Sequence, residues 1–237
     1  MIIEGSISVK ACIEANKREI IELYIQKDKK TKDFNYIRKI AKNKNIKINE
    51  LSKEELSSFL IGKSHGGIGA SVNERKEDSL EKLNDIFFID GIEDPFNLGY
   101  IFRNLYAFGF KDIIIPRRDF NNMEAQLLKS SAGAYEKINI YFSDDNIKTI
   151  NELKEDGYKI YSLFRGDNSK DIFEISFSNK NLIIIGGEKR GINKEILNLC
   201  DEYLYIPYGS DFRNSLNASN ALGVVSTLLF NQRKKND

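Results

Sequence analysis

The chain has 237 residues and a net charge of +1, and 41% of its residues are hydrophobic. That length allows one large domain, or a small and a medium domain, with a substantial core. The near-zero charge excludes a global field that attracts polyanions. Residues 17–47, however, hold eleven Lys/Arg against four Asp/Glu. This local excess predicts either a surface that meets phosphates or a solvated helical face.

The two cysteines, Cys12 and Cys200, lie far apart in apolar contexts. Their spacing fits neither a zinc site nor a disulfide framework, so we expect core residues in a reducing compartment and no metal. No apolar run approaches the ~20 residues of a membrane span. The first residues lack a basic segment followed by a long apolar stretch, unlike a signal peptide. We therefore expect a cytoplasmic protein with no membrane partner.

Residues 1–72 are typical of a small α/β unit. Apolar runs predict strands at 20–25, 46–48 and 68–72, and helical spacing predicts a helix around 34–41. Ser8 is a candidate cap for an earlier helix. Ser52 and Glu55 have the spacing of a capping box, with Gly62 able to close the helix they open.

Residues 73–85 are polar and predict a linker, helical at most near its end. From residue 86 onward, strands and helices alternate, which indicates a mostly parallel sheet with helices on both faces. Such sheets bind ligands beyond the carboxyl ends of their strands. Strands are expected at 86–89, 111–116, 138–141, 158–164, 182–185 and 203–206, and helices at 97–108, 121–131, 143–157 and 216–233. Asn97 and Ser143 are the candidate caps of the helices at 97–108 and 143–157.

Three motifs sit at or just after the ends of these strands. The first is an Asn-x-Gly-x-x-x-Arg from Asn97 to Arg103, and the second is the glycine loop 186–191, GGEKRG. The third combines Ile206-Pro207 with the run 215–219, SLNAS. A Rossmann fold would place a Gly-x-Gly-x-x-Gly after its first strand. The position of this glycine loop disfavours a conventional dinucleotide site.

Together the motifs resemble those of the SpoU/TrmH family of RNA 2′-O-ribose methyltransferases, within the SPOUT superfamily, over essentially the whole chain. The resemblance implies a C-terminal trefoil knot in a SpoU-type methyltransferase domain at 86–237. It implies that residues 1–72 form an L30e-like RNA substrate-binding domain. It also implies S-adenosylmethionine as the methyl donor, a homodimer, and RNA as the partner. Ribosomal and transfer RNA both remain open, with ribosomal RNA favoured.

By the same resemblance, Arg103, Glu188 and Asn217 are the catalytic candidates. A guanidinium resists deprotonation up to a pKa of about 12, so we expect Arg103 to clamp a phosphate and stabilise developing oxygen charge. The structural alternatives are a helix-surface salt bridge for Arg103, a loop-tip carboxylate for Glu188 and a plain helix cap for Asn217.

The resemblance implies a donor pocket lined largely by backbone groups, and substrate contacts from three further residues. The expected donor-pocket residues are Gly186, Gly187, Gly191, Ile206, Ser215 and Leu216. The expected substrate contacts are Asn97, Lys189 and Arg190. His65, the only histidine, is favoured as a turn residue or a phosphate contact over a general base. Asn220 stands where the family usually has an apolar residue and is expected to affect packing of the last helix.

The sequence is compatible with three functions. The first is 2′-O methylation of a ribose in RNA. The second is a catalytically silent RNA-binding protein of the same fold, which the presence of Arg103, Glu188 and Asn217 disfavours. The third is a methyltransferase that acts on a base or a small molecule, against which the first and third motifs argue.

Overall fold

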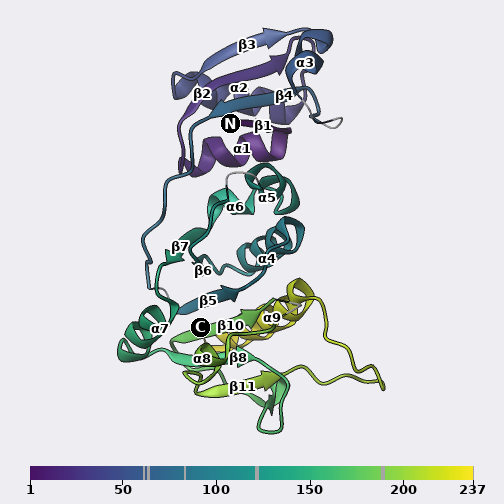
Figure 1. The fold of residues 1–237 in the computed structure, drawn as a ribbon. Helices are drawn as coiled ribbons and strands as arrows, with labels where there is room; N and C mark the ends of the chain where they lie inside the picture. The colour runs from purple at the N-terminus through teal and green to yellow at the C-terminus, as the bar shows by residue number, and fades with distance from the viewer. Residues whose placement is uncertain (61, 63–64, 83, 121–122, 188–189, 237) are drawn as a thin grey trace. The chain divides into compact units, whose positions relative to one another are not determined.

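The computed structural model describes residues 1–60, 62, 65–82, 84–120, 123–187 and 190–236. Its contacts divide the chain into two compact units (Figure 1). The first unit is Met1–Lys76 with Asn121–Lys137, and the second is Glu77–Phe120 with Ile138–Asp237. Residues 121–137 thus pack with the N-terminal part of the chain although they follow much later in sequence. The expected domain boundaries, 1–72, 73–85 and 86–237, stay a prediction.

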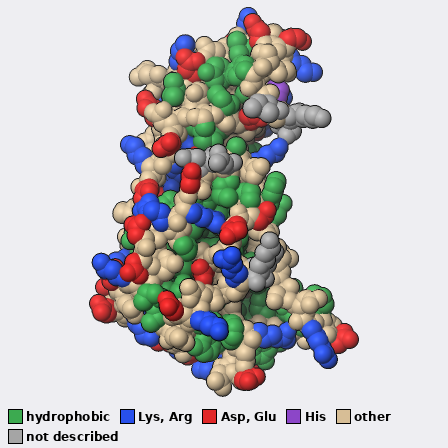
Figure 2. Space-filling model, in the orientation of Figure 1, with side chains coloured by type: hydrophobic (Ala, Val, Ile, Leu, Met, Phe, Trp, Pro, Cys, Tyr) green, Lys and Arg blue, Asp and Glu red, His purple; other side chains and the backbone are tan. Residues whose placement is uncertain are grey.

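Charged side chains of both signs are interspersed over the face shown in Figure 2, in keeping with the net charge of +1. Among the described residues, no helix is long and apolar enough to cross a membrane.

The first unit is built on a four-stranded sheet in the order β1-β4-β2-β3. β4 runs antiparallel to both β1 and β2, and β2 runs parallel to β3. The strands are β1 (Ile2–Glu4), β2 (Ile20–Gln26), β3 (Lys47–Leu51) and β4 (Ile68–Val72). The helices are α1 (Ser6–Ala15), α2 (Lys32–Asn43), α3 (Lys53–Phe59), α5 (Glu124–Ser130) and α6 (Ala134–Lys137).

Helix caps in this unit follow the sequence in part. The capping box of α3 is confirmed, because Ser52 Oγ accepts from the Glu55 amide at 3.2 Å and Glu55 accepts from the Ser52 amide at 2.7 Å. Ser8 is not a cap, since α1 begins at Ser6 and Gly5 precedes it. The expectation for Gly62 is also wrong, because α3 already ends at Phe59.

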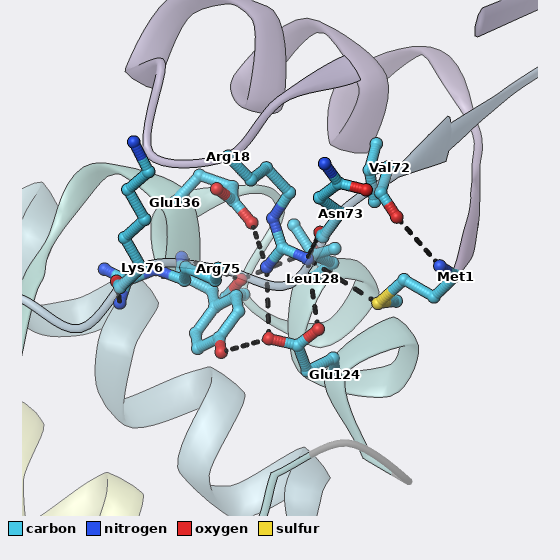
Figure 3. A network of polar contacts seen from close by, with 11 residues as sticks. Met1, Arg18, Val72, Asn73, Arg75, Lys76, Glu124, Leu128 and Glu136 are labelled. Carbon is cyan, nitrogen blue, oxygen red and sulfur yellow. Dashed lines mark hydrogen bonds and ion pairs between the residues drawn. The ribbon is translucent and has the colours of Figure 1, made fainter. Parts of the chain in front are cut away.

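A buried ion network joins α5 and α6 to the rest of the first unit (Figure 3). The fully buried guanidinium of Arg18 donates to Glu124 at 3.0 and 3.1 Å and lies 2.8 Å from a carboxylate oxygen of Glu136. The hydroxyl of Tyr135 donates to Glu124 at 2.7 Å. Burial by itself lowers the pKa of Arg18, but the two carboxylates outweigh it and raise that pKa above its ordinary value.

Replacing Arg18 by methionine should therefore leave two buried carboxylates without their counter-ion. Breaking a buried pair by removing one partner typically costs about 3–5 kcal/mol, so we expect the Arg18→Met protein to lose that much free energy of unfolding in urea. The double variant Arg18→Met/Glu136→Gln should recover part of the loss. Lys47→Met, which removes an exposed partner of Glu22, serves as the control and should change nothing measurable. Equal free energies of unfolding for Arg18→Met and Lys47→Met would contradict a stabilising role of Arg18 between the two buried carboxylates.

The second unit is built on a seven-stranded sheet in the order β7-β6-β5-β10-β8-β11-β9, and every strand pair in it is parallel. The central strands β5 and β10 are buried along almost their whole length, as expected for a parallel sheet covered on both faces. The strands are β5 (Asp85–Asp90), β6 (Asp112–Pro116), β7 (Asn139–Ser143), β8 (Lys159–Leu163), β9 (Lys170–Asp171), β10 (Asn181–Gly186) and β11 (Glu202–Tyr205).

The three helices predicted at 97–108, 143–157 and 216–233 lie close to those positions in the second unit, and two of them have other caps than expected. Asp94 and not Asn97 caps α4, since its carboxylate accepts from the Asn97 amide at 2.7 Å. Asp145 and not Ser143 caps α7. No helix forms in the described part of 73–85. The helices are α4 (Pro95–Ala107), α7 (Asn146–Glu155), the 3₁₀ helix η1 (Ile172–Glu174), α8 (Lys194–Leu197) and α9 (Ala218–Asn236).

Candidate functional site

A cavity of about 480 Å³ lies in the second unit, where β8, β10 and β11 end and α9 begins. These are the carboxyl ends of parallel strands, the place where open α/β sheets bind ligands. Three arginines line it, and its described wall contains no Asp or Glu. The wall includes Arg165, Arg190, Tyr208, Arg213, Ala218 and Ala221, together with the six expected donor-pocket residues.

Glycines form the part of the cavity wall where neighbouring backbone segments come very close. A Cβ on Gly186 would lie 2.3 Å from the carbonyl carbon of Gly191. A Cβ on Gly187 would lie 2.3 Å from the carbonyl oxygen of Gly91, just after β5. Gly191 has a φ of +64°, and its amide donates to the Gly187 carbonyl at 2.9 Å. Only glycine at 186 and 187 allows these contacts, so the loop after β10 can present backbone groups to a ligand.

The first and third motifs meet through an amide pair. Asn217 Nδ2 donates to Asn97 Oδ1 at 3.0 Å. Asn217 Oδ1 accepts from the Ser219 amide at 2.9 Å and from the Ser219 hydroxyl at 2.6 Å, at the start of α9. Asn217 is therefore a helix cap, as the structural alternative held, and it also positions the first motif. Neither asparagine is among the described residues that line the cavity.

Arg103 is exposed on α4 and does not line the cavity of its own chain. No described residue accepts a hydrogen bond from it. The next residue, Asn104, faces α9 instead, where its Nδ2 donates to the Ser219 carbonyl at 3.1 Å. The expected catalytic role of Arg103 stays a prediction. Glu188 and Lys189 lie outside the described residues.

All six residues expected in the donor pocket line the cavity: Gly186, Gly187, Gly191, Ile206, Ser215 and Leu216. Arg190, an expected substrate contact, lines it as well. Their part in binding a donor stays a prediction. Arg165, Tyr208 and Arg213 also line it, and the sequence interpretation did not include them. Their positions just after β8 and β11 are the signal that would have found them.

Two further residues have structural surroundings that bear on their expected roles. His65 lies in the turn of the first unit, where its Nδ1 accepts from the Gly67 amide at 3.1 Å. That contact supports a turn role. Asn220 is exposed on α9, so its side chain does not disturb the core of its own unit.

Comparison with known families identifies the family of this chain. The model of the SpoU rRNA methylase family matches residues 85–227, more than half of the chain. The chain belongs to the SpoU methylase family. A second model, described as RNA 2′-O ribose methyltransferase substrate binding, matches residues 2–78 of this SpoU methylase.

Relatives of this SpoU methylase cover it almost end to end. A protein of Staphylococcus aureus strain MSSA476, assigned to the TrmH family of tRNA/rRNA methyltransferases, is 30% identical over 90% of this chain and 89% of its own length. A relative with the same assignment from Staphylococcus haemolyticus is 29% identical, over 98% and 96%.

Solved structures share the fold of this SpoU methylase at low sequence identity. A TrmH-family protein from Porphyromonas gingivalis matches with a TM-score of 0.81 and 18% identity, covering 98% of this chain and 89% of its own. The SpoU methyltransferase AviRb from Streptomyces viridochromogenes, solved with the cofactor AdoMet, matches with a TM-score of 0.79 and 18% identity, over 99% and 91%. The knot implied by the resemblance stays a prediction.

The glycine wall gives a direct test of the close packing. Gly187→Ala should push the loop after β10 away from Gly91 and cost about 1–3 kcal/mol of unfolding free energy, the usual range for overpacking. Gly209→Ala is the matched control, because no atom lies within 4 Å of its added Cβ. It should leave stability unchanged or raise it by up to about 1 kcal/mol. Urea titrations of both variants give the two free energies of unfolding. An unchanged free energy of unfolding for Gly187→Ala would contradict the close packing at Gly91.

Proposed function

We propose that this SpoU methylase transfers a methyl group from S-adenosylmethionine to a ribose 2′-hydroxyl in RNA. The observation that carries the proposal is one cavity that gathers all six residues expected around the donor. Family membership supports an RNA methyltransferase, and AviRb was solved with the cofactor AdoMet. The second family model adds support for ribose as the acceptor.

The residues of the cavity suit this donor. S-adenosylmethionine, when bound, supplies the methyl group. Gly186 and Gly187 carry no side chains, so the backbone N–H and C=O groups of this part of the wall can hold adenine edges. The arginines of the wall suit the carboxylate of the donor and the phosphates of RNA. Holding both reactants in line supplies up to about 7–11 kcal/mol of the barrier.

Arg103 then needs a partner that reaches the exposed face of α4. Tyr100 and Tyr106 are spaced three residues on either side of Arg103 and, like it, are exposed; Phe230 on the neighbouring α9 is also exposed. We propose that this aromatic face forms a homodimer interface and brings Arg103 of one chain to the cavity of the other. The fully buried Leu222, Val225 and Leu229 of α9 belong instead to the core of their own chain.

The first unit is proposed to bind the RNA. Part of its positive charge is already neutralised, since Arg18 is buried with carboxylates and Arg38 and Lys47 pair with Glu50 and Glu22. Within residues 17–47, the exposed lysines that form no ion pair with a described carboxylate lie at 27, 30, 32, 39, 42 and 44, and these can contact phosphates. Ribosomal RNA is favoured over transfer RNA as the substrate.

The experiment for the whole proposal is methyl transfer in vitro. The purified protein should move labelled methyl groups from S-adenosylmethionine to ribosomal or transfer RNA, and mapping of 2′-O-methyl positions should identify one ribose. A protein that binds RNA but neither binds nor consumes the donor would instead support the silent RNA-binding alternative. Methyl groups recovered on a base would support the third function.

Arg103→Lys tests whether the requirement at this position is geometric or only electrostatic. A guanidinium can hold a phosphate oxygen and the nascent 2′-oxyanion through its planar fork, whereas an ammonium is a compact point charge. Removing one oxyanion donor typically costs ~10²–10³ in turnover, so we expect at least a ~10²-fold fall in kcat. The Kd for S-adenosylmethionine, measured by calorimetry, should stay within ~3-fold, because Arg103 does not line the cavity. Near wild-type turnover would show that the catalytic role is wrong.

Mixed dimers test whether Arg103 acts on the partner's cavity. Ala221→Phe should fill the cavity from α9 and leave α4 untouched. When Arg103→Lys and Ala221→Phe chains are mixed and allowed to exchange, half of the dimers are mixed and each holds one complete site. Activity should then recover to about a quarter of wild type, although each variant alone is inactive. Light scattering should show dimers throughout, and a monomer at micromolar concentration would refute the proposal.

A further inference from the structure

The segment between β11 and α9, residues 206–217, carries a stack of aromatic and arginine side chains. Its ribbon loops out from the sheet (Figure 1). The hydroxyl of Tyr208 accepts from the Leu216 amide at 3.0 Å, which ties the two limbs of the segment together. The guanidinium of Arg165, just after β8, lies 4.7 Å from the centre of the Tyr208 ring. The Phe212 ring is tilted by 47° against Tyr208 at 5.9 Å.

This stack lies at the edge of the donor cavity and is open to solvent. Arg165, Tyr208 and Arg213 all line the cavity, while Phe212 belongs to the same loop and is 49% exposed. Arg165 and Arg213 are exposed, and no carboxylate among the described residues forms an ion pair with either. A large exposed ring in the same cluster as two such cations suits a partner with a flat apolar face and negative charge.

We propose that Phe212 stacks on a base of the RNA substrate while Arg165 and Arg213 contact the adjacent phosphates. Unpaired RNA bases are commonly held on aromatic side chains, and arginine binds phosphate through its planar fork. Because Tyr208 and Arg213 belong both to this loop and to the cavity wall, a base held on Phe212 keeps its nucleotide beside the methyl donor. The inference rests on the proposed function and adds the residues that position the nucleotide.

A second copy of this chain is the competing partner for an exposed phenylalanine. RNA is favoured because the ring sits beside exposed arginines, and the described cavity wall has no carboxylate that a basic partner could meet. Contacts between copies would have to place a carboxylate at each of these arginines, whereas RNA supplies a phosphate at every nucleotide. The oligomeric state of the variants separates the two partners.

The test uses the full-length protein and a mixed-sequence single-stranded RNA of about 20 nucleotides that carries the fluorescent base 2-aminopurine. Stacking on an aromatic ring is sequence-tolerant, so such a probe is adequate. Phe212→Ala should weaken RNA binding at least about five-fold and remove the quenching of 2-aminopurine that wild type produces. Phe212→Tyr keeps a ring and should bind within about two-fold of wild type, whereas Phe212→Leu should resemble Phe212→Ala. Phe173→Ala, which removes another exposed ring that does not line the cavity, is the control and should bind like wild type.

The remaining outcomes separate this inference from the proposed function. Wild type that binds the RNA and quenches the probe but transfers no methyl group would defeat the proposed function and leave the stack intact. RNA affinity of Phe212→Ala equal to wild type, or of Phe212→Leu equal to Phe212→Tyr, would overturn the stack. Failure of wild type to bind the probe would also overturn the stack. So would a loss of affinity in Phe212→Ala that is accompanied by dissociation of its dimer in light scattering.

Discussion

The close approach of backbones around Gly187 is the constraint on which the cavity depends. β5 and β10 are neighbouring parallel strands whose last residues, Asp90 and Gly186, stand side by side. The segments that follow these two strands therefore leave the sheet at the same point, and the space between them admits no side chain. A glycine costs conformational entropy on folding, and here it is required for the approach. The same residues that let the two loops meet also leave this part of the cavity wall without side chains.

Helix α9 connects this wall to the rest of the unit because it is fixed at both ends. At its start, Asn217 bonds to Asn97 of α4. Near its end, Arg233 donates to both carboxylate oxygens of Asp85 at 2.6 and 2.8 Å, and Asp85 also accepts from Asn181. Motif residues more than a hundred positions apart are thereby held by one helix, which lies along α4. The exposed position of Arg103 follows from this packing, because Asn104 takes the side of α4 that faces α9.

Local rules in the sequence predicted the strands, the capping box and the grouping of motifs at strand ends. They misplaced caps where two candidates were close together, since Asp94 forms the cap that Asn97 was expected to form. They could not show that residues 121–137 pack with the first unit. That packing includes the contacts of Arg18 with Glu124 and Glu136, which are more than a hundred residues away in sequence. In the sequence, Arg18 is one more charge in a lysine-rich stretch, and only the folded chain shows it buried.

The pairing of cations, more than their number, indicates where RNA can bind. In the first unit, buried carboxylates neutralise the charge of Arg18, so this arginine does not attract an anionic ligand. In the second unit Arg165 and Arg213 stay exposed at the cavity without an ion-pair partner among the described residues. An unpaired guanidinium at a concave site retains its field, because no internal anion cancels it. A chain with a net charge of +1 can therefore recognise a polyanion, provided that its anions are placed away from the site.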